Sequence, residues 1–133
     1  MKTLPIIWQH LVNAEKQTCS RCGTTGEELR KALQVLEAEL LPQGIQPHLE
    51  IRTMSEEEFL THPEESNRIW IMGVPLEDLV GGIQGSSTCD DVCHGEQCRT
   101  VESQGKTYDA VPASLIVQAC LMIYANKFSL CTI

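Results

Sequence analysis

The sequence predicts a single α/β domain with a central mixed sheet flanked by helices. Residues 48–54 alternate between apolar and polar side chains, as a half-buried strand does. Apolar residues in 27–40 instead recur every three or four positions, as they do on one face of a helix. A chain of 133 residues suffices for one compact domain and is too short for two ordinary ones. We therefore treat residues 1–133 as one domain.

The other elements follow from local composition. Residues 4–12 are apolar enough for a short buried strand. Residues 68–73 are rich in β-branched and aromatic side chains, which indicates a strand buried on both faces. In chain order the predicted elements are a strand over 4–12, a helix over 27–40, a strand over 48–54, a helix over 56–60, a strand over 68–73, a helical turn over 76–80, a Cys-rich loop over 83–98, a hairpin of 98–102 and 106–110, and a helix from Pro112 to Ile123.

Capping residues set the predicted helix ends. Pro42 and Gly44 end the first helix, because proline cannot continue a helix and glycine favours its C-terminus. Ser55 is a good N-cap for the second helix and is followed by three glutamates, which suit the positive end of the helix dipole. Pro112 suits the first turn of the last helix, where its missing N–H costs nothing.

Charge and hydropathy exclude two classes of partner. The net charge is −8, so the chain lacks the basic stripe that nucleic-acid binding requires. No apolar run approaches the roughly 18 to 20 residues that cross a bilayer, so we expect no membrane partner. The first residues lack a signal-peptide core and a small-residue cleavage site, so we expect a cytoplasmic chain.

The seven cysteines are the main functional signal. Their number is odd, and the expected compartment keeps thiols reduced, which disfavours a framework of structural disulfides. Redox chemistry or soft-metal binding remains. The thiols form a Cys-x-x-Cys pair (Cys19 and Cys22), a second cluster (Cys89, Cys93 and Cys98) and two single cysteines (Cys120 and Cys131).

The order of strand, Cys-x-x-Cys, helix, strand, helix, strand, hairpin and helix resembles that of the thioredoxin-like superfamily over nearly the whole chain. Residues 66–73, Ser-Asn-Arg-Ile-Trp-Ile-Met-Gly, resemble the glutaredoxin-type segment in which a cis-proline precedes an apolar strand. Here Asn67 occupies the proline position. The resemblance implies that this proline would lie against the dithiol and help to exclude metal.

A closer resemblance, to a smaller family, implies a fold but no established activity. Cys-Arg-Thr-Val-Glu at 98–102 and Tyr-Asp-Ala-Val-Pro at 108–112 resemble segments of a small uncharacterised prokaryotic family within the thioredoxin-like superfamily. The resemblance implies a central mixed sheet flanked by helices, with the Cys-rich loop inserted before a C-terminal hairpin and helix.

The Cys-x-x-Cys pair suggests a nucleophile and a resolving thiol. At a strand-to-helix junction the first sulfur gains thiolate character from the helix N-terminus, and the second resolves the mixed disulfide. Cys19 would be the nucleophile and Cys22 the resolver, with Arg21 and Lys16 favouring the thiolate of Cys19. Soft-metal ligation and a purely structural role are the alternatives.

A capping box argues against the dipole contribution. Residues 25–28, Thr-Gly-Glu-Glu, fit the pattern in which threonine caps a helix and glutamate three residues later bonds back. The helix would then begin after the cysteines. Cys19 would lose much of the dipole's influence, which fades within about one turn.

The second cluster offers three thiols and the imidazole of His94 within ten positions. These ligands suit Zn²⁺ or a softer thiophilic ion. A second redox pair that exchanges with Cys19 and Cys22 is an equal interpretation, and a surface loop with incidental thiols is a third. His94 is as readily a solvated loop histidine.

The remaining candidates have ordinary interpretations. His10, His48 and His62 have no partner spacing that indicates a metal site. Cys120 lies among apolar residues, which predicts a buried inert thiol. For the core, we expect Leu29, Leu33, Leu36 and Leu40 to pack on strands around Ile7, Ile51 and Ile71.

Strand direction in the thioredoxin-like topology places the two thiol groups together. The strand over 106–110 must run towards the dithiol end to deliver Pro112 there, so its antiparallel partner starts near that end. We therefore expect Cys98, with Cys89 and Cys93, at the Cys19–Cys22 end.

The leading hypothesis is a cytoplasmic thiol-disulfide oxidoreductase of thioredoxin-like type, acting on a protein or small-molecule disulfide or thiol. It requires no cofactor, and Cys89, Cys93 and Cys98 would be an auxiliary relay. The rival is a non-enzymatic binder of zinc or another thiophilic metal, with ligands from Cys19, Cys22, Cys89, Cys93, His94 and Cys98. A third hypothesis is a partner-binding adaptor on an inactive scaffold.

Overall fold

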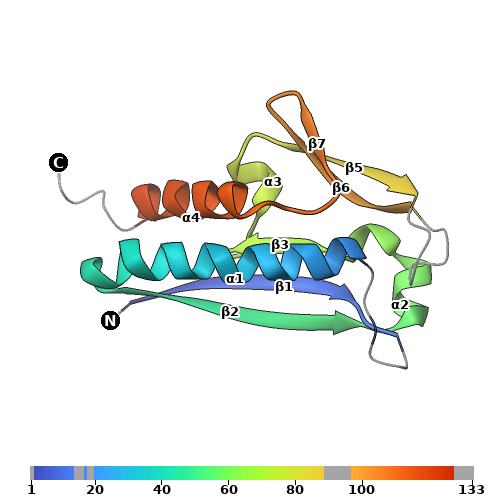
Figure 1. The fold of residues 1–133 in the computed structure, drawn as a ribbon, viewed down its shortest axis with the longest axis horizontal. Helices are drawn as coiled ribbons and strands as arrows, with labels where there is room; N and C mark the ends of the chain where they lie inside the picture. The colour runs from blue at the N-terminus through green and yellow to red at the C-terminus, as the bar shows by residue number, and fades with distance from the viewer. Residues whose placement is uncertain (1, 14–16, 18–19, 89–96, 128–133) are drawn as a thin grey trace.

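The computed structural model of the chain describes residues 2–13, 17, 20–88 and 97–127 (Figure 1). In chain order its elements are β1 (Lys2–Leu11), α1 (Ser20–Leu40), the 3₁₀ turn η1 (Leu41–Gln43), β2 (Ile45–Met54), α2 (Glu56–Thr61), the 3₁₀ turn η2 (Pro63–Glu65), β3 (Arg68–Ile71), β4 (Val74–Pro75), α3 (Leu76–Leu79), β5 (Ile83–Thr88), β6 (Gln97–Ser103), β7 (Lys106–Tyr108) and α4 (Ala113–Lys127). The predicted α/β class, with a mixed sheet and helices, is confirmed.

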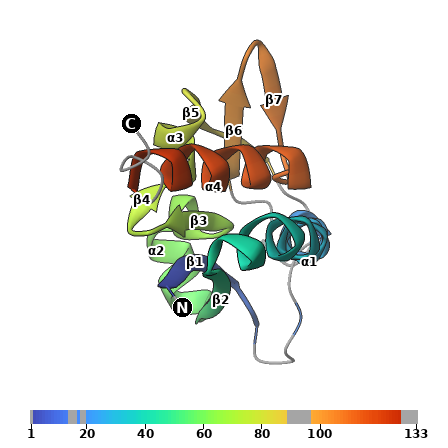
Figure 2. The same cartoon turned by 90° about the vertical axis from the view of Figure 1, so that its left-hand side faces the viewer.

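The main sheet has the strand order β2-β1-β3-β4. β1 and β2 run parallel with Trp8 beside Ile51, and α1 forms the crossover between them. β3 is antiparallel to β1 and pairs Trp8 with Ile69. Helices α1 and α4 pack against each other and cover one face of this sheet (Figure 2).

Helix α1 begins at Ser20, earlier than the capping box at residues 25–28 predicts. The two side chains expected to cap α1 instead bond to the start of α4. The hydroxyl of Thr25 accepts a hydrogen bond from Val111 N at 3.1 Å, and Oε1 of Glu28 accepts one from Ala113 N at 3.0 Å. The capping pattern is therefore used between helices, and the prediction that α1 starts after the cysteines is wrong.

The apolar core lies between the main sheet and the two long helices. Leu29, Leu36 and Leu40 are buried as predicted, whereas Leu33 is only partly buried at the edge of the core. Ile51 is 54% exposed, so the expectation that it anchors the core is wrong. The reason is its position in β2, the outer strand of the sheet.

The side chains of β1 that face the core are also different from those expected. Leu4, Ile6 and Trp8 face the helices and are buried. Ile7 points to the opposite face, because successive side chains of a strand alternate. Ile7 is accordingly half-buried, so the expectation that it lies in the core is wrong, and Ile6 occupies the core position instead.

Strands β5, β6 and β7 form a separate small sheet in that order (Figure 1). β6 and β7 form the predicted hairpin, paired from Val101 to Tyr108. Residues 83–88 were expected to lie in a loop, but they form β5 antiparallel to β6. This strand is polar and glycine-containing, so its pairing with β6 defines it and its composition does not.

Candidate functional site

Cys22 is buried in the first turn of α1, next to the end of β1. Its side chain is 1% exposed. Its Sγ lies 3.6 Å from Oγ of Ser66, and the same Oγ accepts a hydrogen bond from Leu11 N at 2.9 Å. Ser66 therefore links the sulfur to the last residue of β1. The end of β1, the start of α1 and the segment before β3 meet at this point.

Asn67, the residue at the expected proline position, has a backbone that proline cannot adopt. Its φ is +61°, whereas the proline ring fixes φ near −65°. Asparagine adopts this left-handed conformation more readily than most other residues do. Here Oδ1 of Asn67 accepts a hydrogen bond from Nε1 of Trp8 at 3.0 Å, inside the protein. The departure from the glutaredoxin-type segment thus involves both the side chain and the backbone.

Two aromatic rings of β1 stack on each other near the end of this strand. Trp8 and His10 stack with their centroids 4.0 Å apart and their planes 15° apart. His10 is only 7% exposed, and its Nδ1 lies 3.2 Å from the carbonyl of Leu11. Since that carbonyl can only accept, Nδ1 is the protonated nitrogen in this contact. His10 was expected to be an ordinary histidine, and its ring is buried against Trp8.

Gly26 lets α1 approach these rings closely. A Cβ on Gly26 would lie 2.8 Å from Cη2 of Trp8. Cys22 precedes Gly26 by one helical turn, about 6 Å along α1, and His10 follows Trp8 by about 6.6 Å along β1. Because α1 runs back over β1, the two steps go in the same direction. These directions put His10 nearer than Trp8 to the end of α1 that carries Cys22.

Arg99 ties the start of β6 to this end of the molecule. Its side chain is 2% exposed, and its Nε donates to the carbonyl of Glu64 at 2.7 Å. Nη1 pairs with Oε2 of Glu77 at 3.0 Å, and Nη2 donates to Oε1 of Gln84 at 3.0 Å. Burial lowers the pKa of Arg99, and the charge of Glu77 opposes that shift.

The backbone of Cys98 lies next to this anchor. Cys98 lies in β6, one residue before Arg99, and its backbone pairs with Ser87 of β5. Glu64, which Arg99 contacts, is two residues from Ser66, the neighbour of the Cys22 sulfur. The start of β6 is thus on the same side as the start of α1 (Figure 1). Whether the sulfurs of the two groups act together stays a prediction.

Several of the predicted site residues are not among the residues that the structure describes. Cys19, Cys89, Cys93, His94, Lys16 and Cys131 are outside the described residues, as are the side chains of Arg21 and Cys98. Within the described residues no three His, Cys, Asp or Glu side chains are grouped to hold a metal ion. The structure therefore gives the position of Cys22 at the start of α1, and the functional roles of all these residues, Cys22 included, stay predictions.

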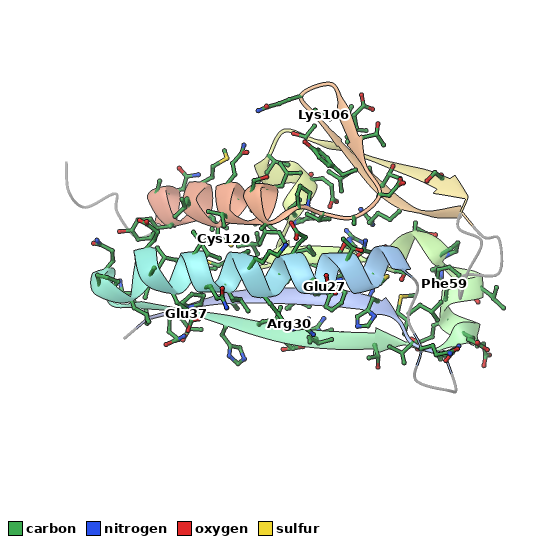
Figure 3. All side chains as sticks on the ribbon, in the orientation of Figure 1. Glu27, Arg30, Glu37, Phe59, Lys106 and Cys120 are labelled. Atoms are coloured by element: carbon green, nitrogen blue, oxygen red, sulfur yellow. The ribbon has the colours of Figure 1, made fainter. Side chains whose placement is uncertain are left out.

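The buried thiol of Cys120 is separate from this site. It is 0% exposed and lies between α4 and α1 (Figure 3). Burial raises its pKa to about 12. The prediction of a buried thiol is confirmed, and a sulfur with this pKa is protonated at neutral pH and therefore a poor nucleophile.

A surface hollow of about 630 Å³ lies at the ends of β1 and β2. Its lining is Val12, Asn13, Thr53, Met54, Ser55 and the three glutamates 56–58. Ser55 and Glu58 bond to each other's backbone N–H groups as a capping box, which lowers the pKa of Glu58. Ser55 and Glu58 thus cap the N-terminus of α2. None of the described cysteines lines the hollow.

Comparisons with known proteins identify the family. A curated relative from Archaeoglobus fulgidus, described as an uncharacterized protein, is 38% identical over 113 residues, which cover 85% of this chain and 82% of that protein. No solved structure matches the chain. Every helix among the described residues is too short or too polar to span a bilayer. The family model described as a domain of unknown function, DUF2703, matches residues 4–120, and the chain therefore belongs to the DUF2703 family.

Proposed function

We propose that this protein is a thiol-disulfide oxidoreductase of thioredoxin-like type, which uses Cys19 and Cys22 in a reducing, cytoplasmic environment. The observation that carries the proposal is the position of Cys22, buried in the first turn of α1 with its sulfur 3.6 Å from the Ser66 hydroxyl. A helix N-terminus favours negative charge in its first turn, and the thiolate is the reactive form of cysteine.

The arrangement of the strands supports the fold that this proposal needs. The thioredoxin-like resemblance implies a first strand that runs to the dithiol, a third strand that runs away from it, and a final helix that starts on the same side. β1 leads towards α1, β3 is antiparallel to β1, and α4 begins beside Thr25 and Glu28 in the first half of α1. These directions agree with the implied topology.

The reaction has two exchange steps. The thiolate of Cys19 attacks one sulfur of a partner disulfide, forms a mixed disulfide and releases the other sulfur as a thiolate. Cys22 then loses its proton and attacks Cys19 Sγ, which forms the Cys19–Cys22 disulfide and releases the second partner thiol. The partner gains two electrons. A dithiol reductant, or a relay through Cys89, Cys93 and Cys98, returns two electrons to the oxidised pair.

Reduction of insulin disulfides by the purified protein tests this proposal. Cys19→Ser should abolish the activity, and Cys22→Ser should trap mixed disulfides at Cys19 that mass spectrometry detects. Cys131→Ser is the matched control and should leave the rate unchanged. Equal, low rates for the wild type and both dithiol variants would show that the pair is not an oxidoreductase centre.

The second candidate function is the binding of zinc or another thiophilic metal by the two thiol groups. Asn67 favours it, because the side chain and backbone at this position are not those of the proline that would help to exclude metal. The donor set of Cys19, Cys22, Cys89, Cys93, His94 and Cys98 consists of the sulfur and imidazole ligands that such ions prefer. Metal analysis of protein purified without oxygen, with a parallel thiol titration, separates the two functions. Stoichiometric metal with protected thiols supports the second.

A further inference from the structure

The outer strand β2 has features of a self-pairing surface. It is ten residues long and stands at the end of the order β2-β1-β3-β4, so β1 is its strand neighbour within the described residues. Figure 2 shows that α1 and α4 lie over the sheet and leave this outer edge uncovered. An exposed strand edge presents N–H and C=O groups that pair readily with another strand.

The hydrogen bonds to β1 show which peptide groups of β2 point outward. Lys2 N donates to the carbonyl of Gly44, and Val12 N donates to that of Met54. In a parallel pair these contacts repeat every second residue, so the even-numbered groups of β2 face β1. The N–H and C=O groups of Leu49, Ile51 and Thr53 therefore face outward and are available to a further strand.

The side chains around Ile51 carry complementary charges. Glu50 and Arg52 flank it, and Oε2 of Glu50 lies 2.7 Å from Nε of Arg52. Both side chains are about half exposed, and both lie on the face opposite Ile51. A strand that runs antiparallel to β2 with the same sequence would offer these charges in the reverse order.

We propose that β2 pairs antiparallel with β2 of a second copy of this chain, about a two-fold axis at Ile51. Ile51 then faces Ile51 of the second copy, and Leu49 faces Thr53, each pair exchanging two hydrogen bonds through outward-facing peptide groups. Glu50 faces Arg52 of the second copy, and Arg52 faces its Glu50. Such pairs lie at the closer, non-hydrogen-bonded positions, where opposite charges attract most strongly.

Charge and backbone together select this register. Moving the axis to Glu50 or to Arg52 preserves the outward-facing pairing but sets two like charges directly opposite each other, which is destabilising. Moving it to Leu49 brings Ile51 opposite Pro47, which has no N–H to donate. The two-fold arrangement uses the same edge of both copies, so association stops at a dimer.

Analytical ultracentrifugation of the full chain in excess reductant tests the proposal, since the reductant removes intermolecular disulfides. The wild type should sediment as a monomer–dimer equilibrium. Glu50→Arg or Arg52→Glu alone should raise the dissociation constant at least about tenfold, because each change places like charges opposite at two symmetry-related positions. The double variant, Glu50→Arg with Arg52→Glu, restores opposite charges and should bring the constant back to the wild-type value.

Lys106→Glu is the matched charge control for Arg52→Glu. Lys106 lies in β7, at the tip of the small sheet and remote from β2 (Figure 3). This control should associate like the wild type, and thermal melting shows whether every variant is folded. A wild type that stays monomeric at all concentrations would overturn the proposal. So would folded single variants that associate like the wild type, or a double variant that dissociates as readily as the singles.

Discussion

The hydroxyl of Ser66 lies 3.6 Å from the sulfur of Cys22 and accepts a hydrogen bond from Leu11 N. One side chain thus satisfies a buried N–H of β1 and contacts the candidate resolving thiol. The sequence marks Cys22 through its spacing from Cys19, but it gives no sign of this serine, 44 residues later. The contact depends on how β1, α1 and the segment before β3 pack.

Ser66→Ala should destabilise the protein and alter the site. The substitution leaves the N–H of Leu11 buried without its acceptor, which costs about 1–3 kcal/mol. Urea unfolding measures this loss, and Ser114→Ala, at an exposed position of α4, is the control. If Ser66 also assists Cys22, breakdown of a Cys19 mixed disulfide should slow in Ser66→Ala. An unchanged unfolding midpoint would contradict the hydrogen-bond role of Ser66.

Two glycines in α1 should respond to alanine with opposite signs. Gly23 has no atom within 4 Å of an added Cβ, so Gly23→Ala should stabilise the helix by about 0.5–1 kcal/mol. Gly26→Ala would bring Cβ to 2.8 Å from the Trp8 ring, and such overpacking costs about 1–3 kcal/mol. Urea unfolding of both variants checks this. Equal stabilisation by both would mean that Trp8 does not lie against α1.

The contact between Glu28 and α4 makes stability depend on pH. The hydrogen bond from Ala113 N, followed by that from Lys31, lowers the pKa of Glu28 in the folded protein. A carboxyl whose folded pKa is lowered contributes stability above its unfolded pKa and loses it as pH falls through the folded value. Glu28→Gln should therefore be less stable than the wild type at neutral pH, with the difference shrinking in acid.

Melting temperatures of the wild type and Glu28→Gln, measured from neutral pH into acid, give the stability difference at each pH. Glu39→Gln, an exposed change on the same helix, is the control for the loss of one negative charge. A difference between Glu28→Gln and the wild type that is constant with pH would show that the carboxylate charge has no part in holding α4.

The helical face of α1 can be tested by paired truncations. Leu36 is 0% exposed and Val35, its neighbour on the same helix, is 47% exposed. Leu36→Ala should cost about 2–5 kcal/mol, whereas Val35→Ala should stay within about 0.5 kcal/mol. Leu33→Ala should fall between them, because Leu33 is only partly buried. Unfolding by urea provides all three values, and equal losses at Leu36 and Val35 would refute this orientation of α1.

Local sequence patterns predicted most of the helices and strands. The features that the patterns did not predict depend on contacts between residues far apart in the sequence. Alternation located β2, β-branched and aromatic content located β3, and helical periodicity located most of α1, since all three are properties of neighbouring residues. The start of α1 was missed because Thr25 and Glu28 bond to residues more than 80 positions away. β5 was missed because its polar composition resembles a loop until β6 pairs with it.

The candidate site was likewise predicted only in part from local sequence patterns. The spacing of Cys19 and Cys22 indicated a dithiol at a strand-to-helix junction, and Cys22 is at the start of α1. His10 was interpreted as ordinary, although it lies two residues after Trp8 on a strand that leads to the dithiol. That spacing places both on one face, and it was the available signal.

The buried pair of Arg99 and Glu77 underlies the last prediction. The two side chains are 2% and 9% exposed, and the guanidinium also bonds to Glu64 and Gln84. Taking these charges out of water is costly, and the mutual attraction and the hydrogen bonds offset that cost. Glu77→Gln removes the negative charge and leaves the arginine buried, and arginine stays charged even when its pKa is lowered.

We therefore expect Glu77→Gln to lose about 3–5 kcal/mol of unfolding free energy, a large part of the roughly 5–15 kcal/mol of a typical domain. Replacing both residues, with Arg99→Met and Glu77→Leu, should cost less than Glu77→Gln alone, because no unpaired charge stays buried. Urea unfolding of this double variant and of its two single variants, Arg99→Met and Glu77→Leu, gives the coupling free energy between the two positions. Additive losses would mean that the two charges do not stabilise each other, and that Arg99 anchors β6 through Glu64 and Gln84.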